Sequence, residues 1–238
     1  MNDQIKTDSY FLQIKSIRTS SNAFLMKLKE GDIIIALDGD PVNKSYEDFS
    51  KELGEIKEKK EKKVLTLLRD KVFFNTFVYG QLGVVCENVN SEQILELENI
   101  NINEYYHQDE FYFLFEVFKK PGNAALLLNT MPSILASIAP PLWMLQNRLW
   151  TYFFITMVFY SCLFMISPWL FFIGWVLKSW YVGNSQIDLL RLFYRLNNYR
   201  LSTSFCAKNE KEAQEIARKF DDKVDFYFSY LEPVILED

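Results

Sequence analysis

Residues that carry chemistry are scarce in this sequence. One histidine, His107, and three cysteines, at positions 86, 162 and 206, stand without metal-ligand spacing, and no P-loop, G-x-S-x-G or H-E-x-x-H motif is present. His107 lies in a polar, aromatic segment without an obvious partner, which predicts an exposed loop histidine. The cysteines are expected to be free thiols in a reducing compartment. The sequence therefore favours a protein that is not an enzyme, with no catalytic residue, no metal site and no cofactor.

Charged side chains are almost absent from the middle of the chain. Between Pro121 and Leu177, Arg148 is the only charged residue. Because a charge at mid-bilayer costs roughly 2.5 to 3.5 kcal/mol, such a run is typical of a membrane-embedded segment. The alternative is a buried core hairpin of a soluble protein.

The apolar run divides into two parts. Residues 149–177 form too long a stretch for one helix across a hydrocarbon core of about 30 Å, and Ser167-Pro168 offers an N-cap followed by a favoured first helical residue. This pattern predicts a tight hairpin of two short helices. Residues 124–145 contain three prolines and suit a re-entrant or interfacial segment. The residues expected at the membrane interface are four tryptophans and one arginine: Trp143, Trp150, Trp169, Trp180 and Arg148.

The flanks of the run predict its orientation. Lys119 and Lys120 precede it, and Lys178 and Arg191 follow it, so both ends carry the cationic excess typical of the cytoplasmic side. An even number of crossings satisfies both flanks. The first residues have no apolar h-region, so no cleavable signal peptide is expected and both termini are expected in the cytoplasm. A net charge of -5 argues against nucleic acid as a partner.

The chain before residue 80 predicts short strands and helices. A strand is expected at residues 10–18, a short helix from the Ser20-Ser21-Asn22 cap to Leu28, and a helix at residues 45–57 with Ser45 as its N-cap. Residues 64–79 predict a β-hairpin that turns at Asp70. The tripeptide Asp38-Gly39-Asp40 has the carboxylates of a Mg²⁺ site, but hairpin turns use the same residues, and a turn is the favoured interpretation.

The stretch LKEGDIIIALDGDPV, residues 28–42, resembles a bacterial PDZ domain, and the likeness covers about residues 9 to 88. The resemblance implies a small β-barrel or sandwich with two helices that binds an extended peptide by strand addition. The tripeptide Leu82-Gly83-Val84 matches the loop whose amides hold the peptide carboxylate, although it follows the last strand instead of preceding the first. The groove-lining helix would present Tyr46, Phe49 and Leu53. For all three side chains ordinary core packing is the alternative, and for Phe49 and Leu53 it is the favoured interpretation.

The segments around the apolar run complete the chain. We expect a linker at residues 89–120, with a short helix at 91–97, a strand at 111–118 and a boundary at Pro121-Gly122-Asn123. Beyond the run we expect an amphipathic helix at 187–196, suited to an anionic membrane surface or continuous with the second membrane helix. A strand at 199–207 and a helix from Asn209 to Phe220 follow.

A second resemblance lies in the segment APPLWML, residues 139–145, followed by Arg148-Leu149-Trp150. It is similar to the bacterial membrane family called domain of unknown function 2628, over about residues 123 to 219. That likeness implies membrane topology and location, with no reaction and no catalytic residue.

Together these patterns predict an α+β protein. Its expected parts are a PDZ-like domain at 9–88, a linker at 89–120, a membrane-embedded hairpin at 121–182, and a cytoplasmic amphipathic helix with a short strand-helix segment at 183–238. The expected function is that of a non-enzymatic, membrane-anchored peptide-binding adaptor at the bacterial inner membrane. The alternative is an accessory subunit of a membrane protease or other membrane enzyme complex. A protein or peptide ligand and the lipid bilayer are the expected partners.

Overall fold

The computed structural model describes residues 11–89, 105 and 111–233. The chain forms two compact units, which are treated separately below. The sheet unit comprises the residues up to Asn129 and those from Leu201 onward, and the helical unit comprises residues from Thr130 to Arg200. His107 and the short helix expected at 91–97 lie outside the described residues.

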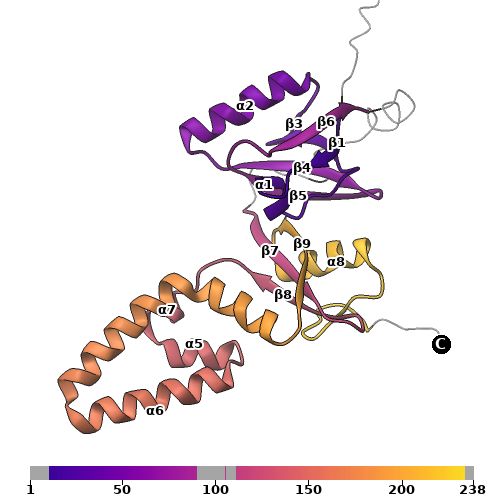
Figure 1. The fold of residues 1–238 in the computed structure, drawn as a ribbon. Helices are drawn as coiled ribbons and strands as arrows, with labels where there is room; N and C mark the ends of the chain where they lie inside the picture. The colour runs from indigo at the N-terminus through magenta and orange to yellow at the C-terminus, as the bar shows by residue number, and fades with distance from the viewer. Residues whose placement is uncertain (1–10, 90–104, 106–110, 234–238) are drawn as a thin grey trace, which may run out of the picture. The chain divides into compact units, whose positions relative to one another are not determined.

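The sheet unit is an α+β structure built on one mixed sheet of ten strands (Figure 1). The strand order is β10-β8-β7-β9-β5-β4-β2-β1-β6, and β3 pairs with β2. Its elements are β1 (Leu12–Ile17), α1 (Asn22–Leu25), β2 (Ile33–Leu37), β3 (Asp40–Pro41), α2 (Tyr46–Lys59), β4 (Lys63–Arg69), β5 (Val72–Val78), β6 (Val84–Asn88), β7 (Phe113–Lys119), β8 (Ala124–Asn129), β9 (Arg200–Ala207), α8 (Glu210–Phe220) and β10 (Asp225–Phe226).

Helix α2 begins and ends where its sequence signals stand. The Ser45 hydroxyl accepts a hydrogen bond from the Asp48 amide at 3.3 Å, as an N-cap should, and Lys60 ends the helix in the left-handed conformation. The apolar side chains Phe49, Leu53 and Ile56 recur at helical spacing and are buried. The expected helix and its cap are confirmed.

Strands β4 and β5 form the expected hairpin. Their antiparallel register runs from Lys63 opposite Val78 to Arg69 opposite Val72. The two turn residues, Asp70 and Lys71, both have positive φ, at 47° and 67°, which is the geometry of the two-residue turn that matches strand twist.

The expected fold is wrong in its larger organisation. Instead of a small separate barrel or sandwich, the structure has a large mixed sheet that β7, β8, β9 and β10 extend. Pro121-Gly122-Asn123 is a hairpin turn, closed by the Lys120 amide on the Ala124 carbonyl at 2.9 Å. The segment that follows, which we expected to enter a membrane, is strand β8, paired with β7 and with Ala125 fully buried. An apolar sequence therefore serves here as a partly buried strand of a sheet.

The helical unit contains α4 (Ile134–Ile138), α5 (Pro140–Gln146), α6 (Trp150–Ile166) and α7 (Pro168–Leu196). The break between α6 and α7 lies where it was expected, because Ser167 accepts a hydrogen bond from the Trp169 amide and Pro168 is the first residue of α7. Helix α7 continues without interruption through residues 187–196, so the expected amphipathic helix is its last part.

The predicted membrane-embedded hairpin, its transmembrane helices and the placement in an inner membrane are wrong. Helix α6 has 17 residues, about 25 Å of rise against a hydrocarbon core of about 30 Å. Helix α7 is longer, but it carries Lys178, Asp188, Arg191 and Arg195. Among the described residues, no helix combines the length and the apolar character needed to cross a membrane.

Candidate functional site

Strand β6 is the last strand in the sheet order and pairs with β1 on one side. In its register, Ile17 lies opposite Val84 and Leu12 lies opposite Asn88. The bonds flanking these pairs show that both are non-hydrogen-bonded pairs: the Arg18 amide donates to the Gly83 carbonyl, and the Val89 amide donates to the Phe11 carbonyl.

The register fixes which backbone groups of β6 are open. In a non-hydrogen-bonded pair, the N–H and C=O of each residue point away from the partner strand. Val84 and Asn88 therefore point theirs to the unpaired edge, and Cys86 does so by alternation. Val85 and Glu87 point theirs toward β1. In the part of the chain that the structure describes, no strand pairs with this edge.

The three residues before and at the start of β6 present their amides together. The carbonyl of Gln81 accepts from the Asn22 side chain at 2.8 Å, that of Leu82 from the Ala23 amide at 3.0 Å, and that of Gly83 from the Arg18 amide at 3.3 Å. These carbonyls are thus held by residues in and just before α1.

A trans peptide places its N–H opposite its C=O, so the amides of the next residues point away from α1. Those amides belong to Leu82, Gly83 and Val84, and none of them donates to an acceptor within the described residues. Three consecutive amides without an acceptor among the described residues make a site that favours an anion such as a carboxylate. Gly83 is required by this geometry, because its φ is +72° and a Cβ there would lie 2.6 Å from the Ser21 Cβ.

Helix α2 lies along the same edge. The Tyr46 hydroxyl donates to the Val84 carbonyl at 2.5 Å. The side-chain amide of Gln81 donates through Nε2 to the Ser50 carbonyl at 2.7 Å, and its Oε1 accepts from the Ser50 hydroxyl at 3.1 Å. A Cβ on Gly80 would meet the Lys57 Cβ at 2.8 Å. One face of α2, with Tyr46, Ser50 and Lys57, thus flanks the loop and the start of β6.

Burial sets the chemistry of the side chains at this edge. Burial raises the pKa of Tyr46, with a smaller contribution from the neighbouring Cys86. Burial also raises the pKa of the Cys86 thiol to about 12. Both groups are therefore neutral at physiological pH, and they present a hydroxyl donor and an apolar thiol rather than a charge or a thiolate nucleophile.

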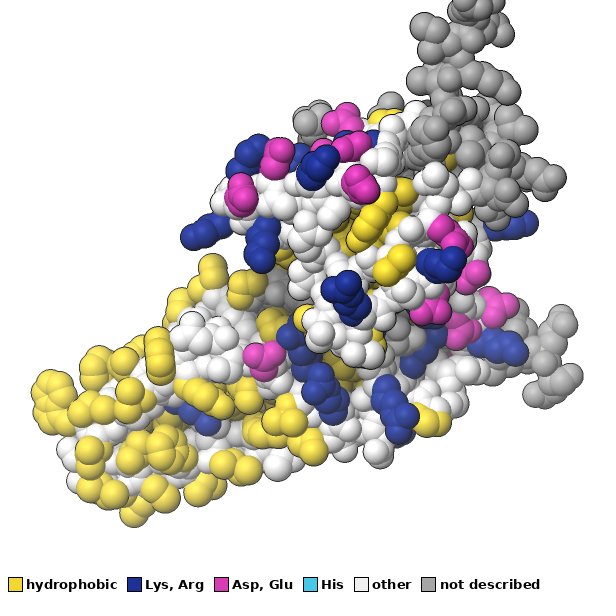
Figure 2. All heavy atoms as spheres, turned by 45° about the horizontal axis from the view of Figure 1, so that its top comes forward, with side chains coloured by type: hydrophobic (Ala, Val, Ile, Leu, Met, Phe, Trp, Pro, Cys, Tyr) yellow, Lys and Arg dark blue, Asp and Glu magenta, His cyan; other side chains and the backbone are white. Residues whose placement is uncertain are grey.

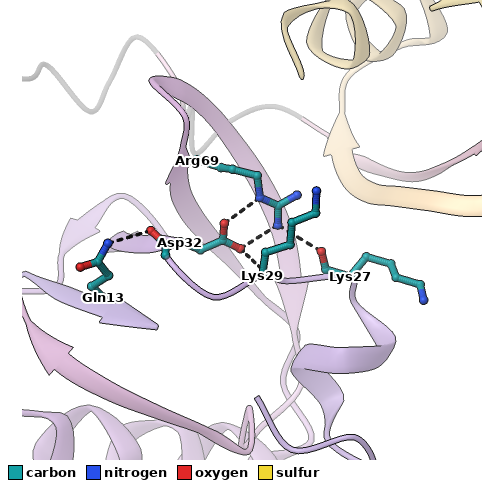
Figure 3. A network of polar contacts seen from close by, with 6 residues as sticks. Gln13, Lys27, Lys29, Asp32 and Arg69 are labelled. Atoms are coloured by element: carbon teal, nitrogen blue, oxygen red, sulfur yellow. Dashed lines mark hydrogen bonds and ion pairs between the residues drawn. The ribbon is translucent and has the colours of Figure 1, made fainter. Parts of the chain in front are cut away.

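A buried ion pair holds α1 in place (Figure 3). Arg69 on β4 donates to both Asp32 carboxylate oxygens at 2.7 Å, and their side chains are 6% and 0% exposed. The Nη2 atom of Arg69 also donates to the Lys27 carbonyl at 3.1 Å, and the Lys29 backbone amide donates to the Asp32 carboxylate at 2.8 Å. The chain just after α1 is thereby tied to β4. Because α1 orients the loop carbonyls, the ion pair supports the amide site indirectly.

The structure brings together some of the predicted site residues and separates others. Leu82, Gly83, Val84 and Tyr46 meet at the open edge of β6. Phe49 and Leu53 are 0% and 2% exposed and lie in the main core cluster of the sheet unit. Ser50 and Gln81 were not singled out from the sequence, because a serine and a glutamine carry no motif of their own. The short segment VVCEN after Gly83 was the available signal for an edge strand.

The residues expected at a membrane interface occupy different environments in the helical unit. Trp143 is 2% exposed, so it belongs to the interior of that unit. Trp150, Trp169 and Trp180 are all more than half exposed, the first on α6 and the others on α7. Arg148 lies in the turn between α5 and α6 with a φ of 56°.

A pocket of about 510 Å³ lies elsewhere on the sheet unit, between β5 and α8. The side chain of Asn75, in the pocket lining, donates to the Tyr105 carbonyl at 2.7 Å and accepts from the Thr66 hydroxyl, which is outside the lining, at 2.8 Å. Among the described residues, no group of three His, Cys, Asp or Glu side chains could hold a metal. The pocket wall mixes charges of both signs: Asp70, Lys71, Lys208, Glu212, Glu215 and Lys219.

Comparison with known proteins adds no family to this picture. Neither a scan against protein-family models nor a search of curated proteins found a match to the chain.

Proposed function

We propose that this protein is a non-enzymatic adaptor whose PDZ-like part binds the C-terminal end of an extended peptide by strand addition to β6. The proposal is carried by the three consecutive amides of Leu82 to Val84, which have no acceptor among the described residues and stand at the start of an open edge strand. In β-augmentation of this kind, backbone amides bind the free carboxylate of the peptide, and the open edge of a strand pairs with the peptide backbone. The amides of Leu82 to Val84 and the edge of β6 offer these two kinds of group.

The register of β6 fixes how the peptide would pair. Its carboxylate accepts from the amides of Leu82, Gly83 and Val84, and its chain runs antiparallel to β6. The last peptide N–H then donates to the Val84 carbonyl, and further bonds form with the N–H and C=O of Cys86. Peptide side chains that point toward α2 meet Tyr46 and Ser50, which thereby select the ligand.

Because the peptide would bind backbone groups of β6, a substitution that removes a backbone N–H is needed to disrupt binding. Proline at position 86 removes an outward amide and fills the open edge, yet it leaves the bonds of Val85 and Glu87 to β1 in place. Cys86→Ala keeps the amide and serves as the matched control. Circular dichroism and thermal unfolding establish that both variants are folded.

The probe is a displayed library of short peptides with free C-termini, selected on the full chain. We expect selected peptides to bind wild type and Cys86→Ala with equal affinity, and to bind Cys86→Pro at least about tenfold more weakly. Peptides with an amidated C-terminus should lose a similar factor in affinity for the wild type. Each change removes charge-assisted or ladder hydrogen bonds worth about 1.4 kcal/mol or more. Equal affinity of free and amidated peptides, or unchanged binding by a folded Cys86→Pro protein, would overturn the proposal.

A further inference from the structure

Helices α6 and α7 carry large apolar side chains that the chain itself leaves exposed. Figure 2 shows hydrophobic side chains gathered over this hairpin. Phe154 is 60% exposed, Met165 86% and Trp169 76%. The other exposed aromatic residues of the two helices are Trp150, Phe159, Phe164, Phe172, Trp180 and Tyr181.

The hairpin is nevertheless a packed structure and not a loose pair of helices. Tyr160 of α6 meets Phe171 of α7 edge to face with ring centroids 5.5 Å apart, and Phe164 meets the same ring at 5.8 Å. The helices approach so closely at Gly174 that a Cβ there would lie 2.3 Å from a Leu163 methyl carbon. The inner faces of α6 and α7 are thus covered by each other, and the exposed apolar surface is an outer face of a formed unit.

We propose that this outer face is an interface between two copies of this chain, in which two α6–α7 hairpins pair into a four-helix bundle. Monomers rarely expose apolar patches beyond a few hundred Å². Seven aromatic residues of α6 and α7 are each more than half exposed. At about 150 to 250 Å² per aromatic side chain, they alone offer roughly 700 Å² per chain, close to the roughly 800 Å² per partner of a standard stable interface.

The charge pattern fits a second copy as the occupant. Residues 149–177 contain no Asp, Glu, Lys or Arg, so a partner needs a surface equally free of charge to avoid burying an unpaired ion. The same hairpin on another chain presents that surface and meets no like-charge repulsion. Isologous pairing is the commonest symmetry of oligomers, and two antiparallel hairpins are the parts of a four-helix bundle.

This inference does not depend on peptide binding, and its test uses the full chain. Phe154→Glu with Phe172→Glu places two charges at positions that are 60% and 51% exposed in the single chain. Lys211→Glu, an exposed change on α8, is the control for altered charge. Sedimentation velocity over a range of protein concentrations measures mass, and circular dichroism measures helix content.

We expect wild type and Lys211→Glu to sediment as two chains and the double variant as one, with equal helix content. Cys162 on α6 is exposed in the single chain, so alkylation of its thiol is expected to be slower in the wild type than in the double variant. A wild type that remains a single chain at every concentration, a double variant that still dimerises, or capture of single chains by phosphatidylcholine vesicles would each overturn the proposal.

Discussion

The Tyr46 hydroxyl donates a hydrogen bond to the Val84 carbonyl oxygen at 2.5 Å, on the one edge of β6 that β1 leaves open. The same carbonyl is the acceptor that an added strand would use first. Tyr46 therefore holds the place of a ligand N–H in the free protein, and a peptide must displace its hydroxyl in order to pair with Val84.

Removing the Tyr46 hydroxyl should strengthen peptide binding. Tyr46→Phe keeps the ring on α2 but frees the Val84 carbonyl, so a peptide no longer breaks an existing hydrogen bond. A neutral hydrogen bond contributes about 0.5 to 1.5 kcal/mol, so affinity should rise by up to about tenfold, with a loss of stability of the same size. Calorimetric titration with a selected peptide measures the change, and Tyr79→Phe, at an exposed tyrosine, is the control. Weaker binding by a folded Tyr46→Phe protein would show that the hydroxyl contacts the ligand instead.

Breaking the Asp32–Arg69 pair should destabilise the sheet unit strongly. Arg69→Met leaves a buried carboxylate without its bidentate partner, which costs about 3 to 5 kcal/mol in comparable pairs. The double variant Asp32→Asn with Arg69→Met removes the unpaired charge and should recover part of that loss. Urea unfolding measures both, and Lys15→Met, which breaks an exposed ion pair with Glu87, should change stability little. Equal unfolding midpoints for Arg69→Met and Lys15→Met would contradict this account of α1 anchoring.

The Lys119–Asp221 contact should make stability depend on acid. Lys119 donates to the Asp221 carboxylate at 2.6 Å, and this hydrogen bond is the main reason that the pKa of Asp221 is lowered from its ordinary 3.8. A lowered folded-state pKa contributes stability that is present above pH 3.8 and is lost as the pH falls through the lowered value. Lys119→Met should therefore flatten the acid limb of thermal stability measured against pH. Lys211→Met, on exposed α8, should keep the wild-type slope; a Lys119→Met slope equal to it would contradict the assignment.

Local structure was predictable because its signals are local. Ser45 marks the start of α2, Asp70 marks the β4–β5 turn, and Ser167-Pro168 marks the break between α6 and α7. Each depends on the capping or backbone preference of one or two residues. Such signals do not depend on where the rest of the chain lies.

Sheet pairing over long distances was not predictable. Asn75 of β5 lies opposite Cys206 of β9, and no sequence pattern pairs residues that far apart. The lack of charge after Pro121 indicated a membrane, but a partly buried strand of a large sheet, such as β8, avoids charge for the same reason. Part of the apolar run forms strand β8 and another part forms the short helix α6. The formation of β8 depends on pairing with strands elsewhere in the chain.

The candidate site was predictable only in part. The helical periodicity that singled out Phe49 and Leu53 marks the face of α2 that packs into the core. Tyr46 is partly buried against the same core cluster, and Tyr46 and Ser50, one turn later, lie at the edge of this face, where they reach Val84 and Gln81. The direction of the Leu82, Gly83 and Val84 amides depends on contacts with Asn22, Ala23 and Arg18, which no pattern in the sequence reveals.

Amide hydrogen exchange along β6, with and without a selected peptide, tests the central claim most directly. Strand addition predicts that the amides of Gly83, Val84 and Cys86 exchange more slowly when the peptide is bound, while those of Val85 and Glu87, already paired with β1, change little. Equal protection at all these positions, or none at Val84 and Cys86 under saturating peptide, would contradict the account.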